Sequence, residues 1–298
     1  MDRLAEHGGC ARRSSIARGP RELAELRGLV ACGAVQRQVR GLYAIPGTRS
    51  DVLAARRVSG LLTCASAAAR LGLPLLTSPS AVHLALPGHR AVPRAGLVPA
   101  GSTLHWDSEV ALSAASEPGL LAPLPTALAH ALKCLPAREA IALADAALNR
   151  RLIELPELTA KRPRTGIVDF DRLLRAVDGR SQSLPETFAR LALTRSGLSV
   201  EPQVEILGVG WVDLLVEELV VVELDGYAFH SDRAQFREDR RRDRVLHLIG
   251  IPCLRYTYDD AVHDSDRLVL EVAGVVRSCR RAGATPIDRS LRRGPRDS

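Results

Sequence analysis

The sequence lacks any long apolar run. No segment approaches the ~20 consecutive apolar residues with which a helix crosses a lipid bilayer. The first nine residues carry Asp2, Glu6 and His7 and lack the apolar centre of a secretory signal peptide. We therefore expect no membrane partner and a location in the cytoplasm.

Closely spaced cysteine pairs are also missing. The six cysteines lie far apart along the chain, and none forms a C-x-x-C pair. Such spacing favours neither a zinc site nor a small disulfide framework. The sequence therefore predicts reduced, mostly buried thiols. They are Cys10, Cys32, Cys64, Cys134, Cys253 and Cys279.

Lysine is nearly absent, since it occurs only at positions 133 and 161, and arginine supplies the rest of the 41 basic residues. The formal net charge is +7 and the pI is about 9.5. Arginine stays charged and presents a planar fork that matches phosphate. A basic chain attracts polyanions, so DNA is the expected partner. A GC-rich genome would produce the same arginine bias without selection for function.

A chain of 298 residues is longer than one ordinary domain. Breaks in its hydrophobic pattern divide it into five parts. We expect an N-terminal domain over 1–48, a mixed α/β middle region over 49–160 and a linker over 161–183. A third domain follows over 184–278. The Arg-, Gly- and Pro-rich tail, 279–298, is predicted to be disordered.

The first two parts show helices and short strands. An apolar stripe over 23–30 after Pro20 predicts a helix, and two short strands flank Arg40-Gly41. In the middle region we expect helices over 51–71, 126–133 and 138–149, with strands over 81–87 and around 104–106. We interpret its scattered histidines as structural. They are His83, His89, His105 and His130.

Residues 184–277 predict helix, two strands, helix, strand and helix, which is typical of an α/β layered sandwich. Ser183 can cap the first helix. The strands over 211–216 and 220–224 form a hairpin that turns at Glu217-Glu218. A helix over 234–249, a strand over 253–258 and a last helix, capped by Asp264 or Ser265 and running to about 277, follow.

Three carboxylates can converge at one end of this hairpin. Glu223 and Asp225 point to the same face because strand side chains alternate. A two-residue turn places Asp213 opposite Val222, and a three-residue turn places it opposite Glu223. In either register Asp213 is within reach of Glu223. Glu186, on the preceding helix, could add a fourth carboxylate.

Such clustering favours a bound cation. Carboxylates a few ångströms apart repel one another, and one is driven towards protonation. Mg²⁺ (or Mn²⁺) removes this penalty, since hard cations take oxygen ligands, and it can activate water for attack on phosphate. We therefore expect Asp213, Glu223 and Asp225 to be metal ligands. The alternative is that Glu223 and Asp225 face solvent on an edge hairpin, but the strands are nearly all aliphatic and buried acids need partners.

The runs V-D-L-L-V, V-V-V-E-L-D-G-Y-A-F-H and D-R-R-R-D-R-V-L-H-L-I-G-I-P-C-L-R-Y-T follow one another between residues 212 and 257. They resemble the very-short-patch-repair endonuclease-like domain of the PD-(D/E)XK nuclease superfamily. The resemblance covers roughly residues 184–275. It implies a restriction-endonuclease-like α/β sandwich and metal-dependent phosphodiester hydrolysis.

The resemblance also implies roles for individual residues. Asp213 and Glu223 match the superfamily's metal-binding acids, and Glu186 matches the acid on its first helix. His230 matches the histidine that follows the E-x-D-G motif, where it would assist proton transfer. The expected catalytic set is therefore Glu186, Asp213, Glu223, Asp225 and His230.

One position departs from the superfamily. Its usual lysine, two residues after the second acid, is here Asp225, and no lysine follows Lys161. Many proteins with this subtype of domain share the feature. Arg242 and Arg255 match later polar positions, as does Asp239, and we expect the two arginines to contact DNA phosphates. Arg255 lies in an apolar stretch, where an unpaired charge would be costly. We therefore expect it to pair with the acids.

The phrase G-A-V-Q-R-Q-V-R-G-L-Y-A-I-P-G, residues 33–47, resembles the winged-helix domain at the start of AbiEi-type antitoxin-like proteins. The middle region resembles the same proteins more weakly. In such modules one helix enters the major groove and the wing contacts the backbone. The expected phosphate contacts are Arg21, Arg27, Arg37 and Arg40. A winged helix used for protein contacts is the alternative.

Together these features predict the α/β fold class, as a multidomain α+β chain. It comprises an N-terminal winged helix, a mixed α/β middle region and a C-terminal PD-(D/E)XK sandwich. The first functional hypothesis is a Mg²⁺-dependent DNA endonuclease. The second is a DNA-binding regulator or antitoxin-like protein whose nuclease fold is catalytically inactive. In a third, the acids only hold an arginine-rich core together. A homodimer and a partner toxin are left open.

Overall fold

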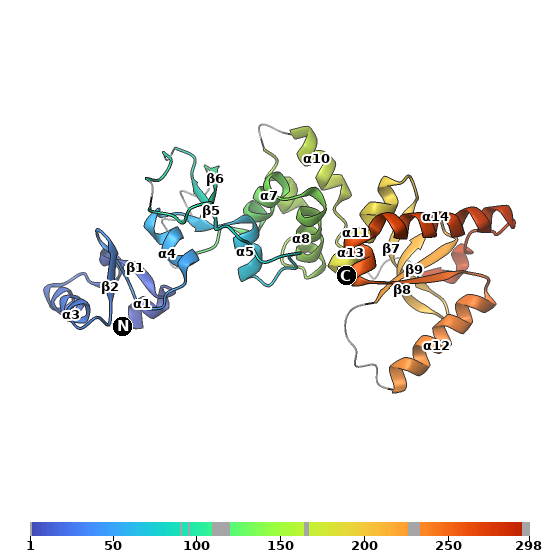
Figure 1. Cartoon of the computed structure of the whole chain (residues 1–298), viewed down its shortest axis with the longest axis horizontal. Coiled ribbons are helices and arrows are strands. Elements are labelled where there is room, and N and C mark those ends of the chain that lie inside the picture. Colours follow the sequence, from blue (N-terminus) through green and yellow to red (C-terminus); the bar gives the residue numbers. More distant parts are fainter. Residues whose placement is uncertain are drawn as a thin grey trace. The chain divides into compact units, whose positions relative to one another are not determined.

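The computed structural model describes residues 2–89, 91–94, 96–108, 120–163, 167–225 and 233–293. The chain forms two compact units (Figure 1). Unit 1 comprises Met1–Pro136 and Ile153–Asp171, and unit 2 comprises Ala137–Leu152 and Arg172–Ser298. Each unit combines helices with strands, which confirms the multidomain α+β class.

The first part of unit 1 is a three-stranded antiparallel sheet with short helices. Its elements are α1 (Asp2–Glu6), β1 (Cys10–Arg12), α2 (Arg13–Ile16), α3 (Pro20–Ala31), β2 (Gln36–Val39) and β3 (Leu42–Ala44). The sheet order is β1-β3-β2. Gly41 turns the β2–β3 hairpin with a φ of 75°, a conformation that favours glycine. The predicted helix and hairpin are confirmed, whereas β1 was not predicted.

The second part of unit 1 contains a mixed sheet of order β4-β5-β6. Its elements are α4 (Ser50–Arg57), β4 (Leu61–Leu62), α5 (Cys64–Arg70), β5 (His83–Pro87), β6 (Thr103–Asp107), α7 (Leu124–Cys134) and α9 (Leu155–Thr159). The helix expected over 51–71 is thus divided by β4. Gly60 lies so close to β5 that a Cβ atom there would come within 2.8 Å of the Ala85 carbonyl oxygen. Only a residue without a side chain fits this close to β5, and helix α4 ends before it, at Arg57.

Unit 2 is built on a five-stranded sheet of order β10-β9-β8-β7-β11, in which β10 and β9 are parallel and the other pairs antiparallel. Its strands are β7 (Val200–Ile206), β8 (Gly210–Val216), β9 (Val220–Asp225), β10 (Cys253–Thr257) and β11 (Arg292–Arg293). Its helices are α8 (Ala137–Asn149), α11 (Leu184–Arg195), α12 (Arg233–Leu248), α13 (Tyr258–His263) and α14 (Ser265–Arg281), with a 3₁₀ turn, η1 (Arg289–Leu291). α10 (Ile167–Ala176) spans the division between the units.

Helices cover both faces of this sheet (Figure 1). On one face, Val220 and Val222 of β9 pack with side chains of α11, α13 and α14. On the other, Val221 packs with Leu246 of α12. The sheet is therefore the middle layer of an α/β sandwich, because apolar residues alternate along β9 and both faces are buried.

The structure corrects three expectations for this region. The strand β7 was missed, since Pro202 and Gln203 interrupt its pattern and Gln203 has a φ of 52°. The last helix, α14, begins at Ser265 as expected, but the short helix α13 before it was not predicted. The tail is not disordered up to residue 293: β11 pairs with β7, and Ile287 is only 5% exposed. The buried side chain of Ile287 anchors this C-terminal segment, although its Arg-, Gly- and Pro-rich composition predicted disorder.

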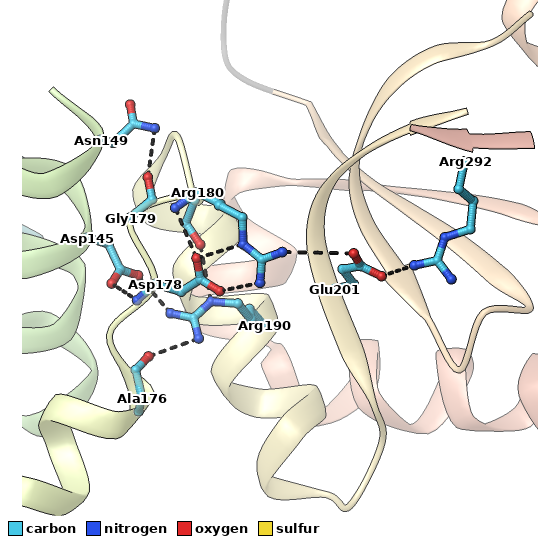
Figure 2. A network of polar contacts seen from close by, with 10 residues as sticks. Asp145, Asn149, Ala176, Asp178, Gly179, Arg180, Arg190, Glu201 and Arg292 are labelled. Atoms are coloured by element: carbon cyan, nitrogen blue, oxygen red, sulfur yellow. Dashed lines mark hydrogen bonds and ion pairs between the residues drawn. The ribbon is translucent and has the colours of Figure 1, made fainter. Parts of the chain in front are cut away.

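A buried ion pair anchors α8 within unit 2 (Figure 2). Asp145 of α8 accepts a 2.8 Å hydrogen bond from Arg190 of α11, and it also accepts from Thr187 and from the Asp178 backbone. Arg190 donates in addition to the Ala176 carbonyl. Each buried charge is thus partnered, as burial requires. Helix α8 therefore packs against α11 within unit 2.

Among the residues described above, no helix combines the length and the apolar character that crossing a bilayer demands.

Candidate functional site

The acidic cluster begins at the start of α11. Ser183 caps this helix, as expected, by accepting the Glu186 N–H at 3.3 Å. The Glu186 carboxylate accepts in return from the Gln182 backbone at 2.9 Å. Burial, and then the charge of Asp213, raise the pKa of Glu186. A carboxylate of helix α11 is thus held beside the strands.

Gln203 of β7 joins two of the acids. Its amide nitrogen donates to Glu186 at 3.0 Å and to Asp213 at 3.2 Å, while its oxygen accepts from Gln182 at 2.9 Å. The side chain is 8% exposed. Sequence reasoning missed this residue because it missed the strand that carries it. Gln203 supplies two acids with one shared donor, which holds them at a fixed separation.

Asp213 lies where β8 and β9 separate. The β8–β9 ladder pairs Leu214 with Val222, and continuing this register places Asp213 opposite Glu223. The regular ladder stops there, and the Asp213 carboxylate accepts the Leu224 N–H at 2.8 Å. Val212 and Leu214, on either side of Asp213, pack in the clusters of opposite sheet faces. The hairpin thus uses the three-residue turn, and Asp213 fills the gap between two strands.

Glu223 is the second acid of the pair and is 8% exposed. It accepts a 2.8 Å hydrogen bond from Arg242 of α12 and lies beside Arg255 in the parallel register of β9 and β10. Burial, and then the charge of Asp213, raise the pKa of Glu223 to about 7, against the opposing effect of Arg242. Asp213 and Glu223 are therefore close enough to oppose each other's ionisation.

Asp225 ends β9 with an exposed side chain. Its charge contributes to the raised pKa values of both Asp213 and Glu223. The structure therefore brings the acids of the expected set, Glu186, Asp213, Glu223 and Asp225, into one electrostatically coupled group. The fifth expected residue, His230, lies outside the described residues.

The two arginines expected at this site differ. Arg242 donates to Glu223 and to the Trp211 carbonyl, so it belongs to the cluster. Arg255 was expected to pair with the acids, but its 2.6 Å partner is Asp243 of α12. Its side chain is exposed rather than buried within the apolar strand, so it did not need the acids to compensate its charge.

The four arginines expected to contact DNA lie in the first part of unit 1. Arg21 and Arg27 are on α3, Arg37 is on β2, and Arg40 is in the β2–β3 turn. All four side chains are exposed. Their charges are therefore accessible to an anionic partner.

A second group of polar side chains gathers in unit 1, where the sequence indicated no chemistry. Cys64, His83, His105 and Cys134 place one ligand atom each within 4.8 Å of all the others. The four residues are widely spaced along the chain, so no local motif could have revealed the group. Only the packing of α5, β5, β6 and α7 brings them together.

Comparison with known proteins found relatives in Mycobacterium tuberculosis. No protein-family profile matches the chain. The uncharacterized proteins MT2308 and Rv2248 of Mycobacterium tuberculosis, strains CDC 1551 / Oshkosh and ATCC 25618 / H37Rv, are each 30% identical over 213 residues, covering 68% of this chain and 76% of the relative. Among solved structures, the crystal structure of the RV2827C protein from Mycobacterium tuberculosis matches with a TM-score of 0.37 and 16% identity, over 63% of this chain and 78% of that chain.

Proposed function

The chain belongs to the same family as the Mycobacterium tuberculosis proteins MT2308 and Rv2248, and we propose that it is a divalent-metal-dependent DNA endonuclease. One observation carries the proposal. Asp213 and Glu223 face each other at the point where β8 and β9 separate, and the Asp213 carboxylate accepts hydrogen bonds from neutral amide groups. An arrangement that by itself costs free energy is explained by a ligand that removes the cost.

The donor set suits a hard divalent cation. Asp213, Glu223 and Asp225 offer only carboxylate oxygens, which Mg²⁺ and Mn²⁺ prefer. Each Asp213 oxygen accepts one hydrogen bond, from Gln203 or from Leu224, and keeps a further lone pair. Gln203 and the Leu224 N–H would therefore orient the Asp213 carboxylate without occupying it fully.

In this proposal Asp213 and Glu223 hold the cation, whereas Asp225 serves both as a metal ligand and as a proton acceptor. The cation, when bound, would lower the pKa of a water molecule and offset charge on the attacked phosphate. Asp225 is exposed beside the buried acids and would accept a proton from the attacking water. Arg242 would bind a phosphate oxygen, because its guanidinium is 21% exposed beside the acids.

Unit 1 would supply general DNA affinity. The sheet and helices around β1-β3-β2 follow the order helix, strand, helix, helix, strand, strand, and they present Arg21, Arg27, Arg37 and Arg40 to solvent. Arginine contacts to phosphate position a protein on DNA without reading its sequence. The excess of positive charge supports the same partner.

A DNA-binding regulator without catalysis is the second candidate, and one contact favours it. Arg242 already pairs with Glu223, so part of the negative charge is compensated without a metal. Position 225 holds an acid where the resembled superfamily carries lysine. Such a protein would retain the fold and the exposed arginines of unit 1 while lacking hydrolysis.

Plasmid cleavage separates the two candidates. Supercoiled DNA is incubated with the full-length protein and Mg²⁺ or Mn²⁺, beside Asp213→Ala and Glu223→Ala. Glu238→Ala is the matched control, since Glu238 is an exposed α12 acid whose partner is Arg241. The endonuclease proposal expects nicking by the wild type and the control only. DNA retardation in a gel without metal-dependent nicking would overturn it in favour of the regulator.

A further inference from the structure

Four elements of unit 1 contribute to the second polar cluster. Cys64 begins α5, His83 begins β5, His105 lies in the middle of β6, and Cys134 ends α7. Cys64 is 1% exposed and His83 8% exposed. Cys134 lies at the exposed edge of the group. A side chain from each element thus reaches the same point.

The separations between these atoms match a tetrahedral metal centre. Zinc takes cysteine sulfur at about 2.3 Å and histidine nitrogen at about 2.0 Å. The edges of that tetrahedron are about 3.3 Å between two nitrogens and about 3.6 Å between nitrogen and sulfur. Here His83 Nδ1 lies 3.5 Å from His105 Nε2 and 3.8 Å from Cys134 Sγ. These two separations are therefore near the spacing that a bound ion would impose, and all four ligand atoms lie within 4.8 Å of one another.

Hydrogen bonding alone explains this convergence poorly. His83 Nδ1 approaches both an imidazole nitrogen and a sulfur, but one ring nitrogen can act only as a donor or as an acceptor at a time. A metal ion would satisfy both contacts at once, because imidazole nitrogen and cysteine sulfur are both metal ligands.

The surroundings hold two of the ligands in place. Cys64 has a φ of 50°, which a non-glycine residue adopts only where its surroundings enforce it. The residue before it, Thr63, contacts His130 Nδ1 at 2.8 Å through its hydroxyl. His130 in turn stacks on His105, with ring centroids 4.6 Å apart, and pairs with Asp107 at 3.5 Å. The stacked ring of His130, itself held by Thr63 and Asp107, thus restricts the orientation of His105.

We propose that Cys64, His83, His105 and Cys134 form a structural zinc site that ties α5, β5, β6 and α7 together. Two sulfurs and two nitrogens select zinc over Mg²⁺ or Mn²⁺, which prefer oxygen. Four protein ligands close the coordination shell, so the ion serves folding rather than catalysis. The site is separate in residues and chemistry from the carboxylates of unit 2, and it stands whether or not the chain cleaves DNA.

Metal analysis of the tag-free full-length protein tests the proposal. Elemental analysis is expected to give about one zinc per chain after purification in buffers without added metal. Replacement by Co²⁺ is expected to give the intense visible bands of tetrahedral cobalt together with a thiolate charge-transfer band. Cobalt spectra lacking the thiolate band, or a wild-type protein that takes up neither ion, would overturn the proposal. So would a Cys64–Cys134 disulfide, shown by fewer than six free thiols in denaturant.

Substitutions then assign the ligands. Cys64→Ser and Cys134→Ser are expected to lower the zinc content about fivefold or more, and Cys32→Ser, an exposed cysteine of the same unit, to leave it unchanged. Asp213→Asn with Glu223→Gln must also leave it unchanged, because those acids lie in unit 2. Equal zinc in every variant would place the ion elsewhere. Should the cysteine variants not fold, the cobalt spectrum of the wild type decides.

Discussion

Asp213 and Glu223 lie opposite each other at the end of the β8–β9 ladder, and each disfavours the negative charge of the other. The β9 chain does not close this gap with a backbone hydrogen bond to β8. Instead the Leu224 N–H donates to the Asp213 carboxylate. Separate hydrogen-bond donors thus hold Asp213 and Glu223 near each other. Repulsion between the two carboxylates lowers the stability of the fold, and its effect depends on pH because it requires both to be ionised.

This cost predicts how the metal-free protein responds to pH. Glutamate ordinarily titrates near 4.5, and burial together with Asp213 raises the pKa of Glu223 to about 7. The folded state thus holds its proton more tightly than the unfolded state does. The contribution of Glu223 to stability is greatest below pH 4.5, falls between pH 4.5 and 7, and then stays level. Glu223→Gln removes this decline, so at pH 8 we expect unit 2 to gain about 1–3 kcal/mol.

Urea unfolding followed by Trp211 fluorescence, in a Trp106→Phe background, measures unit 2 separately, because each unit contains one tryptophan. Glu238→Gln on α12 is the control and should change little. A Glu223→Gln variant that is less stable than its parent at pH 8 would show that the pair with Arg242 outweighs burial and repulsion.

The buried pair of Asp145 and Arg190 predicts an effect of the opposite sign. Asp145→Asn leaves the guanidinium of Arg190 buried without its counter-charge, since the two side chains are 1% and 8% exposed. We expect the free energy of unfolding of unit 2 to fall by about 3–5 kcal/mol. Breaking the exposed pair of Glu238 and Arg241 should change the free energy of unfolding little, because solvent screens it. Equal destabilisation by the two variants would argue against α8 being anchored through this charge.

The exposed arginines of unit 1 predict the salt dependence of DNA binding. Removing one phosphate interaction should lower the slope of log affinity against log salt by about 1. Changing Arg21, Arg27, Arg37 and Arg40 together to Gln should therefore flatten that slope markedly and weaken binding to any duplex. Arg162→Gln is the control, because Arg162 pairs with Asp171. Fluorescence anisotropy at several salt concentrations measures both. An unchanged slope in the fourfold variant would move the DNA-binding surface elsewhere.

The C-terminal segment predicts a stability effect that its composition hides. Ile287 is 5% exposed and packs in the cluster that contains Val209 and Leu246. Ile287→Ala should lower the free energy of unfolding of unit 2 by about 2–4 kcal/mol, since it removes buried apolar atoms and leaves a cavity. Ser290→Ala, an exposed neighbour, is the control. No difference between the two variants would indicate that the segment is not docked in solution.

The elements that sequence reasoning found share strong local signals. The cap at Ser183, the apolar stripe of α3 and the aliphatic runs of β8 and β9 each depend on neighbours in sequence. The elements that it missed depend on distant partners. β7 contains Pro202 and a left-handed Gln203, and β11 exists because β7 offers an edge to pair with.

The candidate sites divide in the same way. Asp213, Glu223 and Asp225 were found because a hairpin fixes which residues face one another. The partner of Arg255 was predicted wrongly, since an apolar strand does not reveal that its middle residue is exposed beside Asp243. The Cys64 and Cys134 group was not foreseen, because its four residues meet only when the mixed sheet and two helices assemble.

Manganese binding tests most directly whether the acids are gathered for a cation. Titration of the full-length protein with Mn²⁺, followed by the decrease of the free-ion electron paramagnetic resonance signal, counts bound ions without requiring catalysis. We predict that the wild type binds Mn²⁺ and that Asp213→Asn combined with Glu223→Gln abolishes this binding, while Glu238→Gln retains it. Equal Mn²⁺ uptake by the wild type and the double variant, or none by either, would contradict the proposed metal site.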